Sequence, residues 1–327
     1  MLSDFITFNE LFPWFFPTLV FLFGAMTGSF LNVCILRIPL EKSIITPGSH
    51  CSCGRSIPIY HNIPILSWIF LRGKCHCPER RPFSIRYPAI ELLTAVLFLA
   101  CWLLFPPDKA LAAFVFIAIL ICATFIDFDH MIIPDRFTIG GFIVGVILAF
   151  FIPSLHGREA DVAVLASLQS GLLAIIGGLI GSAVILWIGI LGSIALRKEA
   201  MGFGDVKFIA AIGAFTGWQG AIFAIFGGAL VGLVGLVLFS IGRRLLGQSP
   251  SPKTSPAANS PSPAHDSPKE EEHALGEDEE HHDEAGMISF GPMLAIGGLI
   301  YFLIAEEWVD AYFAENAALI FQSTPIF

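Results

Sequence analysis

The chain has 327 residues, of which 55% are hydrophobic and only 14% are charged. Its mean hydropathy of +0.76 excludes an ordinary soluble domain and indicates a polytopic helical membrane protein. The net charge of -9 does not describe the whole surface, because ten Asp/Glu and two Lys fall in the single segment 247–285. The rest of the chain is close to neutral, which argues against a nucleic-acid-binding surface.

Apolar runs long enough, or nearly long enough, to cross a bilayer core of about 30 Å follow one another along the chain. We count about eight of them, at 13–36, 88–106, 109–127, 136–153, 168–196, 206–216, 218–242 and 287–305. The first run has no basic segment before it, so we interpret it as a retained span and not as a signal peptide. The sixth and seventh are divided at Gly217-Trp218-Gln219-Gly220 and predict a helical hairpin, although one long broken helix is the alternative.

Loop charge gives the orientation. The loop 37–87 carries eight Lys/Arg against Glu41 and Glu79, so the positive-inside rule predicts that it lies in the cytoplasm. With about eight spans, both termini then lie outside, and the basic positions near Arg136, Lys207 and Arg243 all fall inside.

Small residues in the first run favour close helix packing, notably Gly24, Gly28 and Ser29. Asn32 lies near the inner end of the same run, where it either bonds another helix or lines a site, and both interpretations stay open.

Composition divides the chain into five regions. These are a first transmembrane helix (1–37), a cytoplasmic loop (38–87), a transmembrane core (88–246), an acidic insert (247–285) and a last transmembrane helix with a C-terminal tail (286–327). The insert is Ser/Pro/Ala-rich and then Glu/Asp/His-rich, a composition that cannot bury a core, so we predict that it is disordered.

Two acidic motifs end or begin apolar runs at the predicted cytoplasmic face. One is Asp205 in Met201-Gly202-Phe203-Gly204-Asp205, and the other contains Asp127, Asp129 and Asp135. An ionised carboxylate near the membrane interior costs several kcal/mol unless it is paired or used. Taken singly, each Asp has a structural explanation; Asp135 follows Pro134 and fits a helix N-cap, with Arg136 beside it.

Taken together, the two motifs predict that Asp127 and Asp205 meet in space. Two neighbouring carboxylates do not both ionise easily and therefore share a proton. One can then act as general base on a water molecule while the other donates to a scissile carbonyl. Gly202 and Gly204 leave room for a peptide backbone beside Asp205, and Lys207 lies two residues further on.

Several motifs also carry a resemblance. Gly202-Phe203-Gly204-Asp205 resembles the GxGD motif of membrane aspartyl proteases, and residues 127–135 resemble the companion motif of type IV prepilin peptidases. The remaining motifs that resemble this family occur in the same order, at 28–33, 37–39, 62–64, 86–88 with Glu91, and 290–292. The similarity covers nearly the whole chain except the insert.

The resemblance implies an all-α membrane endopeptidase in which Asp127 and Asp205 are the catalytic pair. Asp129, Asp135, Gly202, Gly204 and Lys207 would be supporting residues. The family removes the basic leader from type IV prepilins and type II secretion pseudopilins at the cytoplasmic face of the bacterial inner membrane. Many members then methylate the new N-terminal amine with S-adenosylmethionine, for which the sequence reveals no binding residues.

The seven cysteines fall into two groups. Cys34, Cys101 and Cys122 lie in apolar runs and are expected to be small core residues. The other four lie in the polar loop and predict a metal site in a cytoplasmic setting, namely Cys51, Cys53, Cys75 and Cys77. The resemblance points to zinc, but the family has two C-x-x-C pairs where this chain has two C-x-C pairs, and a reduced metal-free loop is the alternative.

Two alternative functions are also compatible with the sequence. The first is a peptidase without methyltransferase activity. The second belongs to another class, a transporter whose membrane carboxylates carry protons or cations. Inverted repeats would favour the transporter, and we find none in the sequence.

Overall fold

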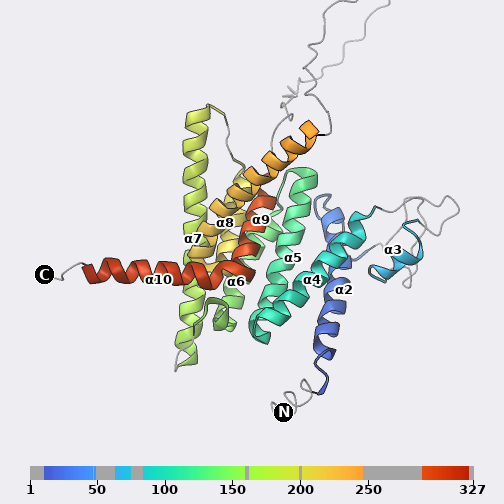
Figure 1. Cartoon of the computed structure of the whole chain (residues 1–327), viewed down its shortest axis with the longest axis horizontal. Coiled ribbons are helices and arrows are strands. Elements are labelled where there is room, and N and C mark those ends of the chain that lie inside the picture. Colours follow the sequence, from blue (N-terminus) through green and yellow to red (C-terminus); the bar gives the residue numbers. More distant parts are fainter. Residues whose placement is uncertain are drawn as a thin grey trace, which may run out of the picture. The chain divides into compact units, whose positions relative to one another are not determined.

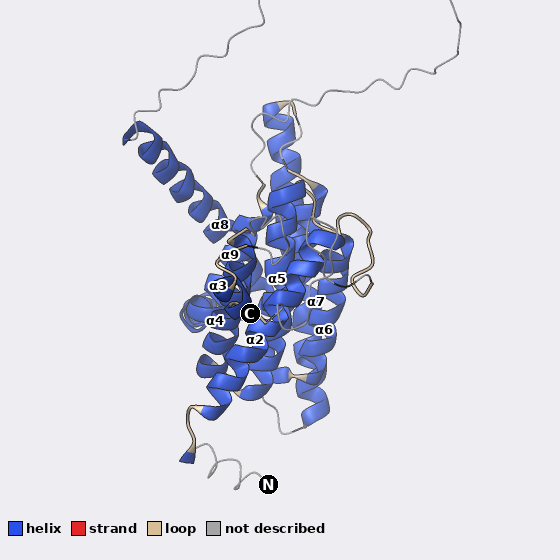
Figure 2. Ribbon diagram, turned by 90° about the vertical axis from the view of Figure 1, so that its right-hand side faces the viewer, coloured by secondary structure: helices blue, strands red, loops and turns tan. Residues whose placement is uncertain are grey.

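The computed structural model describes residues 11–46, 48, 63–74, 84–158, 162–198, 201–245 and 289–323. Figures 1 and 2 show helices and no β-strand in this part of the chain. The helices are α2 (Phe15–Arg37), α3 (Leu66–Phe70), α4 (Arg86–Leu104), α5 (Pro107–His130), α6 (Asp135–Phe151), η2 (Pro153–His156), α7 (Ala163–Leu196), α8 (Phe203–Leu245), α9 (Gly291–Ile300), η3 (Tyr301–Ala305) and α10 (Glu306–Ser323).

The chain forms two compact units, residues 1–232 with 289–327, and residues 233–288. Asp127, Asp205 and the side chains around them belong to the first unit. The last part of α8 and the predicted acidic insert belong to the second, and residues 246–288 lie outside the described residues.

Six of the described helices are long and apolar enough to cross a membrane, in agreement with a polytopic all-α protein. Their spans are Phe15–Arg37, Arg86–Leu104, Pro107–His130, Ala163–Leu196, Phe203–Arg243 and Gly291–Asn316. The predicted count of eight is not confirmed. The difference arises because α6 has only 17 residues and because the sixth and seventh predicted runs both fall within α8.

A break at Gly217 divides α8. Its φ of 70° and ψ of -178° suit glycine, and the helix continues on both sides of it. Before the break, α8 runs antiparallel to α7, because Val206 bonds Ser182 and the later residue Gly213 lies against the earlier residue Gly177. Beyond the break they reverse, so that Ile209 and Ala221 both lie against Gly181. The two arms therefore run in different directions, as the hairpin prediction expects.

The first predicted span packs closely on the second, as its glycines suggested. A methyl group placed on Gly24 would lie 2.7 Å from the Ala95 Cα, and one on Gly28 would lie 2.7 Å from the Glu91 Cα. Asn32 Nδ2 donates a hydrogen bond of 3.1 Å to the Tyr87 carbonyl. Asn32 thus bonds another helix, the first of its two interpretations.

Helix α5 is the centre of the first unit, and its span is the most buried of the six. Aromatic rings pack along it: the Phe98 and Phe114 centroids are 4.3 Å apart, and those of Phe116 and Phe215 are 4.8 Å apart. Two charged side chains near the ends of α5 are nevertheless buried, Lys109 near its start and Asp127 near its end.

Candidate active site

Asp127 lies in the last turn of α5, where the helix ends in a left-handed residue. Met131 has φ 54° and its backbone N–H donates to the Asp127 carbonyl at 2.9 Å. The chain then turns through Ile132 and Ile133 to Pro134, the N-cap of α6. Only 5% of Asp127 is exposed, so its carboxylate faces protein and not the surroundings.

Asp205 lies in the first turn of α8, far from Asp127 along the chain. Its backbone N–H donates to the Gly202 carbonyl at 3.2 Å, which fixes the helix start at the predicted motif. The half-buried Asp205 side chain is close enough to Asp127 for the two carboxylates to interact electrostatically. The structure thus places Asp205 within electrostatic range of Asp127, the acid that the sequence predicted it to meet.

A third element, the start of α9, contacts the Asp127 carboxylate. The Ser289 hydroxyl donates to Asp127 Oδ2, and the Gly291 backbone N–H also bonds Asp127. A methyl group on Gly291 would overlap the Asp127 carboxylate and would come within 3.0 Å of Ile133 Cδ1. Gly204, beside Asp205, faces Ile133 as well, because a methyl group placed on it would lie 3.8 Å from the Ile133 Cβ.

The sequence analysis missed Ser289 and Gly291 as part of this site. It placed Phe290-Gly291-Pro292 only at the start of the last helix. A signal was present, because a Pro such as Pro292 directly before an apolar run is typical of a helix start, and such a start presents free N–H groups to anions. The neighbouring sequence did not indicate that the anion at this helix start would be the Asp127 carboxylate.

The other acidic residues are held by cations from different helices. Asp129 forms an ion pair of 2.7 Å with Arg86 of α4, which also donates to the Phe125 carbonyl. Asp135 forms an ion pair of 2.7 Å with Lys207 of α8. Its hydrogen bond with the Lys207 ammonium holds the pKa of the Asp135 carboxyl below the ordinary value.

Two details differ from the expected roles of these residues. Asp135 is the first residue of α6 and not its N-cap, which is Pro134 and makes no side-chain capping bond. Lys207, expected next to Asp205, lies over the Phe203 ring at 5.3 Å and bonds Asp135. Lys207 therefore ties the start of α8 to the start of α6, which positions Asp205 indirectly.

The two motif glycines are not crowded. A methyl group placed on Gly202 would lie 3.9 Å from Asp205 Oδ2, and one on Gly204 would meet only Ile133. Neither has a positive φ, unlike Gly217. Within the described residues, therefore, neither close packing nor an unusual backbone conformation accounts for the absence of side chains at these two positions.

The predicted zinc ligands cannot be placed, because Cys51, Cys53, Cys75 and Cys77 lie outside the described residues. Among the residues that are described, no group of three or more His, Cys, Asp or Glu could hold a metal ion. The other three cysteines, Cys34, Cys101 and Cys122, are buried and free, as expected of core residues.

Comparison with known families covers most of the chain. Residues 22–105 match the family described as the bacterial peptidase A24 N-terminal domain. Residues 114–237 match the type IV leader peptidase family. The second match contains both Asp127 and Asp205, and the first contains Arg86 and Glu91.

Similar proteins match between about two thirds and nearly all of the chain. A prepilin leader peptidase/N-methyltransferase of Myxococcus xanthus is 33% identical over 95% of this chain and 96% of its own. One of Aeromonas hydrophila is 35% identical over 69% of this chain and 83% of its own. A type 4 prepilin-like proteins leader peptide-processing enzyme of Escherichia coli is 37% identical over 63% of this chain and 79% of its own. No solved structure matches the chain.

Proposed function

The chain belongs to the type IV leader peptidase family, and from this premise we propose that Asp127 and Asp205 are its catalytic pair. The protein is a multi-pass membrane prepilin peptidase and N-methyltransferase, which removes the leader from prepilins and methylates the new N-terminus. Type II secretion pseudopilins are further substrates in this proposal. The observation that carries it is the convergence of two carboxylates from α5 and α8, helices that are distant in the sequence.

The geometry suggests different roles for the two acids. Asp127 accepts hydrogen bonds from the Ser289 hydroxyl and the Gly291 N–H, and such bonds favour the ionised form of a carboxylate. Asp127 then acts as the general base, and the shared proton resides on Asp205. Asp129 and Asp135 are already paired with cations and serve as supporting residues.

The reaction then proceeds in two steps. In the first, Asp127 takes a proton from water, the water oxygen bonds to the scissile carbonyl carbon, and Asp205 gives its proton to the carbonyl oxygen. In the second, the C–N bond breaks, the amine leaves with the proton that Asp127 had taken, and Asp205 recovers a proton from the carbonyl hydroxyl. Both acids return to their initial states, and one water has been consumed.

Substrate approach also follows from this arrangement. The Asp127 end of α5 lies at the cytoplasmic membrane face of the bacterial inner membrane in our proposal, supported by the basic loop 37–87. A pilin helix lying in the bilayer would present its cleavage site at that depth. Gly202 and Gly204 leave space beside Asp205 for its extended backbone, and the ionised acid attracts a basic leader.

Methyl transfer requires a donor, and S-adenosylmethionine supplies the methyl group when it is bound. The chain must offer it the newly formed N-terminal amine in its neutral form, because an ammonium is not a nucleophile. The described residues do not reveal where the donor binds, so no side chain is assigned to this step.

Mass spectrometry of a co-expressed prepilin tests the proposal directly. We expect a new N-terminus at the start of the mature hydrophobic segment. We also expect its amine to carry the added mass of one methyl group. Cleavage without the methyl mass would support the peptidase-only alternative. An intact prepilin in the presence of well-folded, membrane-inserted protein would refute the proposed function and revive the transporter alternative.

We also propose that the four loop cysteines hold one zinc ion. Four thiolates suit tetrahedral zinc, although C-x-C pairs give a tighter bite than C-x-x-C pairs. Purified protein should contain about one zinc per chain, and replacing Cys75 and Cys77 by Ser should remove it. A matched variant at Cys34 and Cys101, which lie buried elsewhere, should retain the metal. A wild-type protein without zinc, purified free of chelators, would contradict the site.

A further inference from the structure

The chain changes direction after α9. Residues Tyr301–Ala305 form a π-helical turn, a rare geometry that often accompanies functional features, and α10 follows it directly. Figure 1 shows α10 running across the bundle and not continuing along α9. By length and composition alone, Gly291–Asn316 qualifies as one membrane span. The bend shows that α10 does not continue in the direction of α9.

By the bend, the chain has run alongside α5 from one end to near the other. Gly291 touches Asp127 at one end of α5, and Glu306 touches Lys109 near its other end. Helices α9 and η3 have 10 and 5 residues, and a segment of this length rises about 22 Å. Because α5 is itself long and apolar enough to cross a membrane, α10 begins near the opposite end of that span from Asp127.

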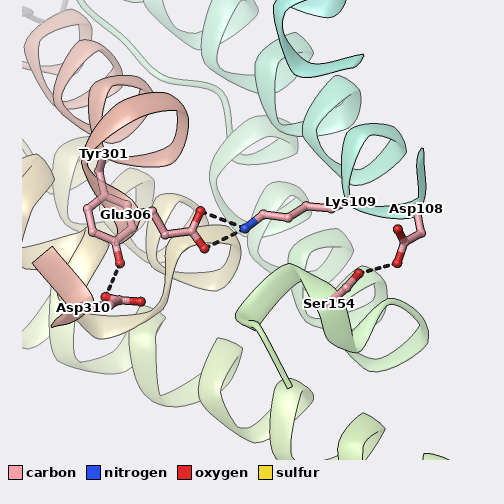
Figure 3. Close-up of polar contacts among 6 residues, drawn as sticks. All are labelled: Asp108, Lys109, Ser154, Tyr301, Glu306 and Asp310. Atoms are coloured by element: carbon pink, nitrogen blue, oxygen red, sulfur yellow. Dashed lines mark hydrogen bonds and ion pairs between the residues drawn. The ribbon is translucent and has the colours of Figure 1, made fainter. Parts of the chain in front are cut away.

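Polar contacts mark this end of α5, as Figure 3 shows. Lys109 Nζ donates to both carboxylate oxygens of Glu306, at 2.6 and 2.8 Å, and the Tyr301 hydroxyl donates to Asp310 Oδ1 at 2.8 Å. Asp108 and Ser154 are hydrogen-bonded beside them. Charged groups rarely lie within the hydrocarbon layer, so this paired cluster fits its edge. It also ties the first turn of α10 to α5 and η3.

Two sides of α10 have different surroundings. Val309 is buried, and the Phe313 ring lies 5.0 Å from that of Trp218, so this side packs on the bundle. Trp308 and Tyr312 are 72% and 57% exposed, and their stacked rings are 6.4 Å apart. At about 100° per residue, Trp308 and Tyr312 share one free side of the helix.

A third side of α10 is polar or small, and it is exposed. Glu307 and Ala314 share this side, which the helical period separates from the Trp308–Tyr312 pair and from the packed side. Glu315 is also exposed and lies at the border of the aromatic side, where a carboxylate would be costly in hydrocarbon but not at the headgroups. Trp and Tyr are the residues that prefer the headgroup layer, where an apolar ring meets a polar surrounding.

We propose that α10 lies in the phospholipid headgroup layer at the Lys109 end of the bundle and binds lipid through Trp308 and Tyr312. An exposed Trp–Tyr pair on a helix at the end of a membrane bundle is typical of the membrane interface, and the charged residues of α10 are all acidic. Glu307 and Ala314 face water, and the last transmembrane span ends at Ala305.

This inference does not depend on the catalytic pair. The side chains that carry it lie at the opposite end of α5 from Asp127. Lipid binding by α10 and catalysis by Asp127 and Asp205 are therefore independent of each other. Different measurements test them.

Cysteine accessibility tests the proposal in the full-length protein. Glu307, Trp308, Tyr312 and Ala314 are each replaced by Cys, and every variant is placed in phospholipid nanodiscs at one copy per disc. Modification by a water-soluble maleimide is followed over time by mass spectrometry of the α10 peptide, which separates it from the seven native cysteines. Thermal unfolding like that of the parent protein confirms that each variant is folded.

The proposal expects Glu307→Cys and Ala314→Cys to react about tenfold faster than Trp308→Cys and Tyr312→Cys. On the side that contacts lipid, a thiol has less polar surroundings than in water, so it forms less of the reactive thiolate. Equal fast modification of all four variants would place α10 in water and overturn the proposal. Equal slow modification of all four would place it in the hydrocarbon as a continued span and would also overturn it.

A parallel measurement in cell membranes distinguishes lipid from a protein partner. If lipid covers the aromatic side, Trp308→Cys and Tyr312→Cys are slow in both cell membranes and single-copy nanodiscs. If they are slow in cell membranes but fast in nanodiscs, a second protein or a second copy of this chain covers Trp308 and Tyr312, and lipid binding is refuted.

Discussion

Replacing either Asp127 or Asp205 by Asn is expected to reduce leader removal by about 10³-fold or more, with the protein still folded and inserted. Asn has nearly the shape of Asp but can neither take a proton from water nor give one to a carbonyl oxygen. Asp127→Asn keeps one side-chain oxygen that can accept the Ser289 hydrogen bond, so the loss would report on chemistry. The measurement is the rate of prepilin cleavage in proteoliposomes.

A third acid on the same side of the bundle supplies the matched control. Asp129 differs from Asp127 by two positions, but it forms a partly exposed ion pair with Arg86. Such pairs contribute about 0–1 kcal/mol, so Asp129→Asn should reduce cleavage by less than about tenfold. Near-normal cleavage by Asp127→Asn or Asp205→Asn would remove that residue from the reaction. An equal loss in Asp129→Asn would mean that the assay responds to charge or folding at this end of the protein in general.

Sequence reasoning predicted the helices well because a membrane leaves the chain few choices. In hydrocarbon every backbone N–H and C=O must bond within the chain, so a long apolar run becomes a helix. The run predicted at 109–127 is α5 (Pro107–His130), and the run predicted at 287–305 matches α9 and η3 together. The predicted run 287–305 ends at residue 305 because Glu306 and Glu307 interrupt the apolar pattern, and the chain bends at the same place.

The count of spans was harder, because length alone does not reveal a bend. Gly217 was correctly singled out as a break, but whether two arms of α8 each cross the bilayer depends on tertiary contacts with α7 and α9. A glycine in a helix costs only about 1 kcal/mol, so its presence does not by itself require a kink.

Contacts between distant segments were the least predictable part of the site. The proximity of Asp127 and Asp205 was inferred from chemistry, since an unpaired carboxylate near the bilayer interior is costly unless it is paired or takes part in a reaction. The Ser289 bond to Asp127 joins residues 162 positions apart, and local patterns contain no information on which helix ends are neighbours. For the same reason, proximity in sequence suggested Asp205 as the neighbour of Lys207, whereas the observed partner is Asp135.

The start of α9 therefore provides a second test of the site that leaves both acids in place. Gly291→Ala is expected to lower the cleavage rate by about 10²-fold, because the added methyl group would overlap the Asp127 carboxylate. Asp127 would have to rotate or α9 would have to withdraw, and either movement separates Asp127 from the Ser289 hydroxyl or from Asp205. The overlap should also cost about 1–3 kcal/mol of stability, partly offset because Ala is a better helix former than Gly by about 1 kcal/mol.

Gly171→Ala is the matched control for this substitution. Its added methyl group would lie 3.7 Å from the Phe150 Cβ, an ordinary contact, and it lies in α7 away from both acids. Thermal unfolding should show that both variants are folded at the assay temperature, and only Gly291→Ala should lose activity. Full activity in Gly291→Ala would contradict the tight packing of α9 on Asp127. A loss of folded protein in that variant alone would show that Gly291 serves helix packing, so the carboxylate contact could not be assigned a part in catalysis from this change.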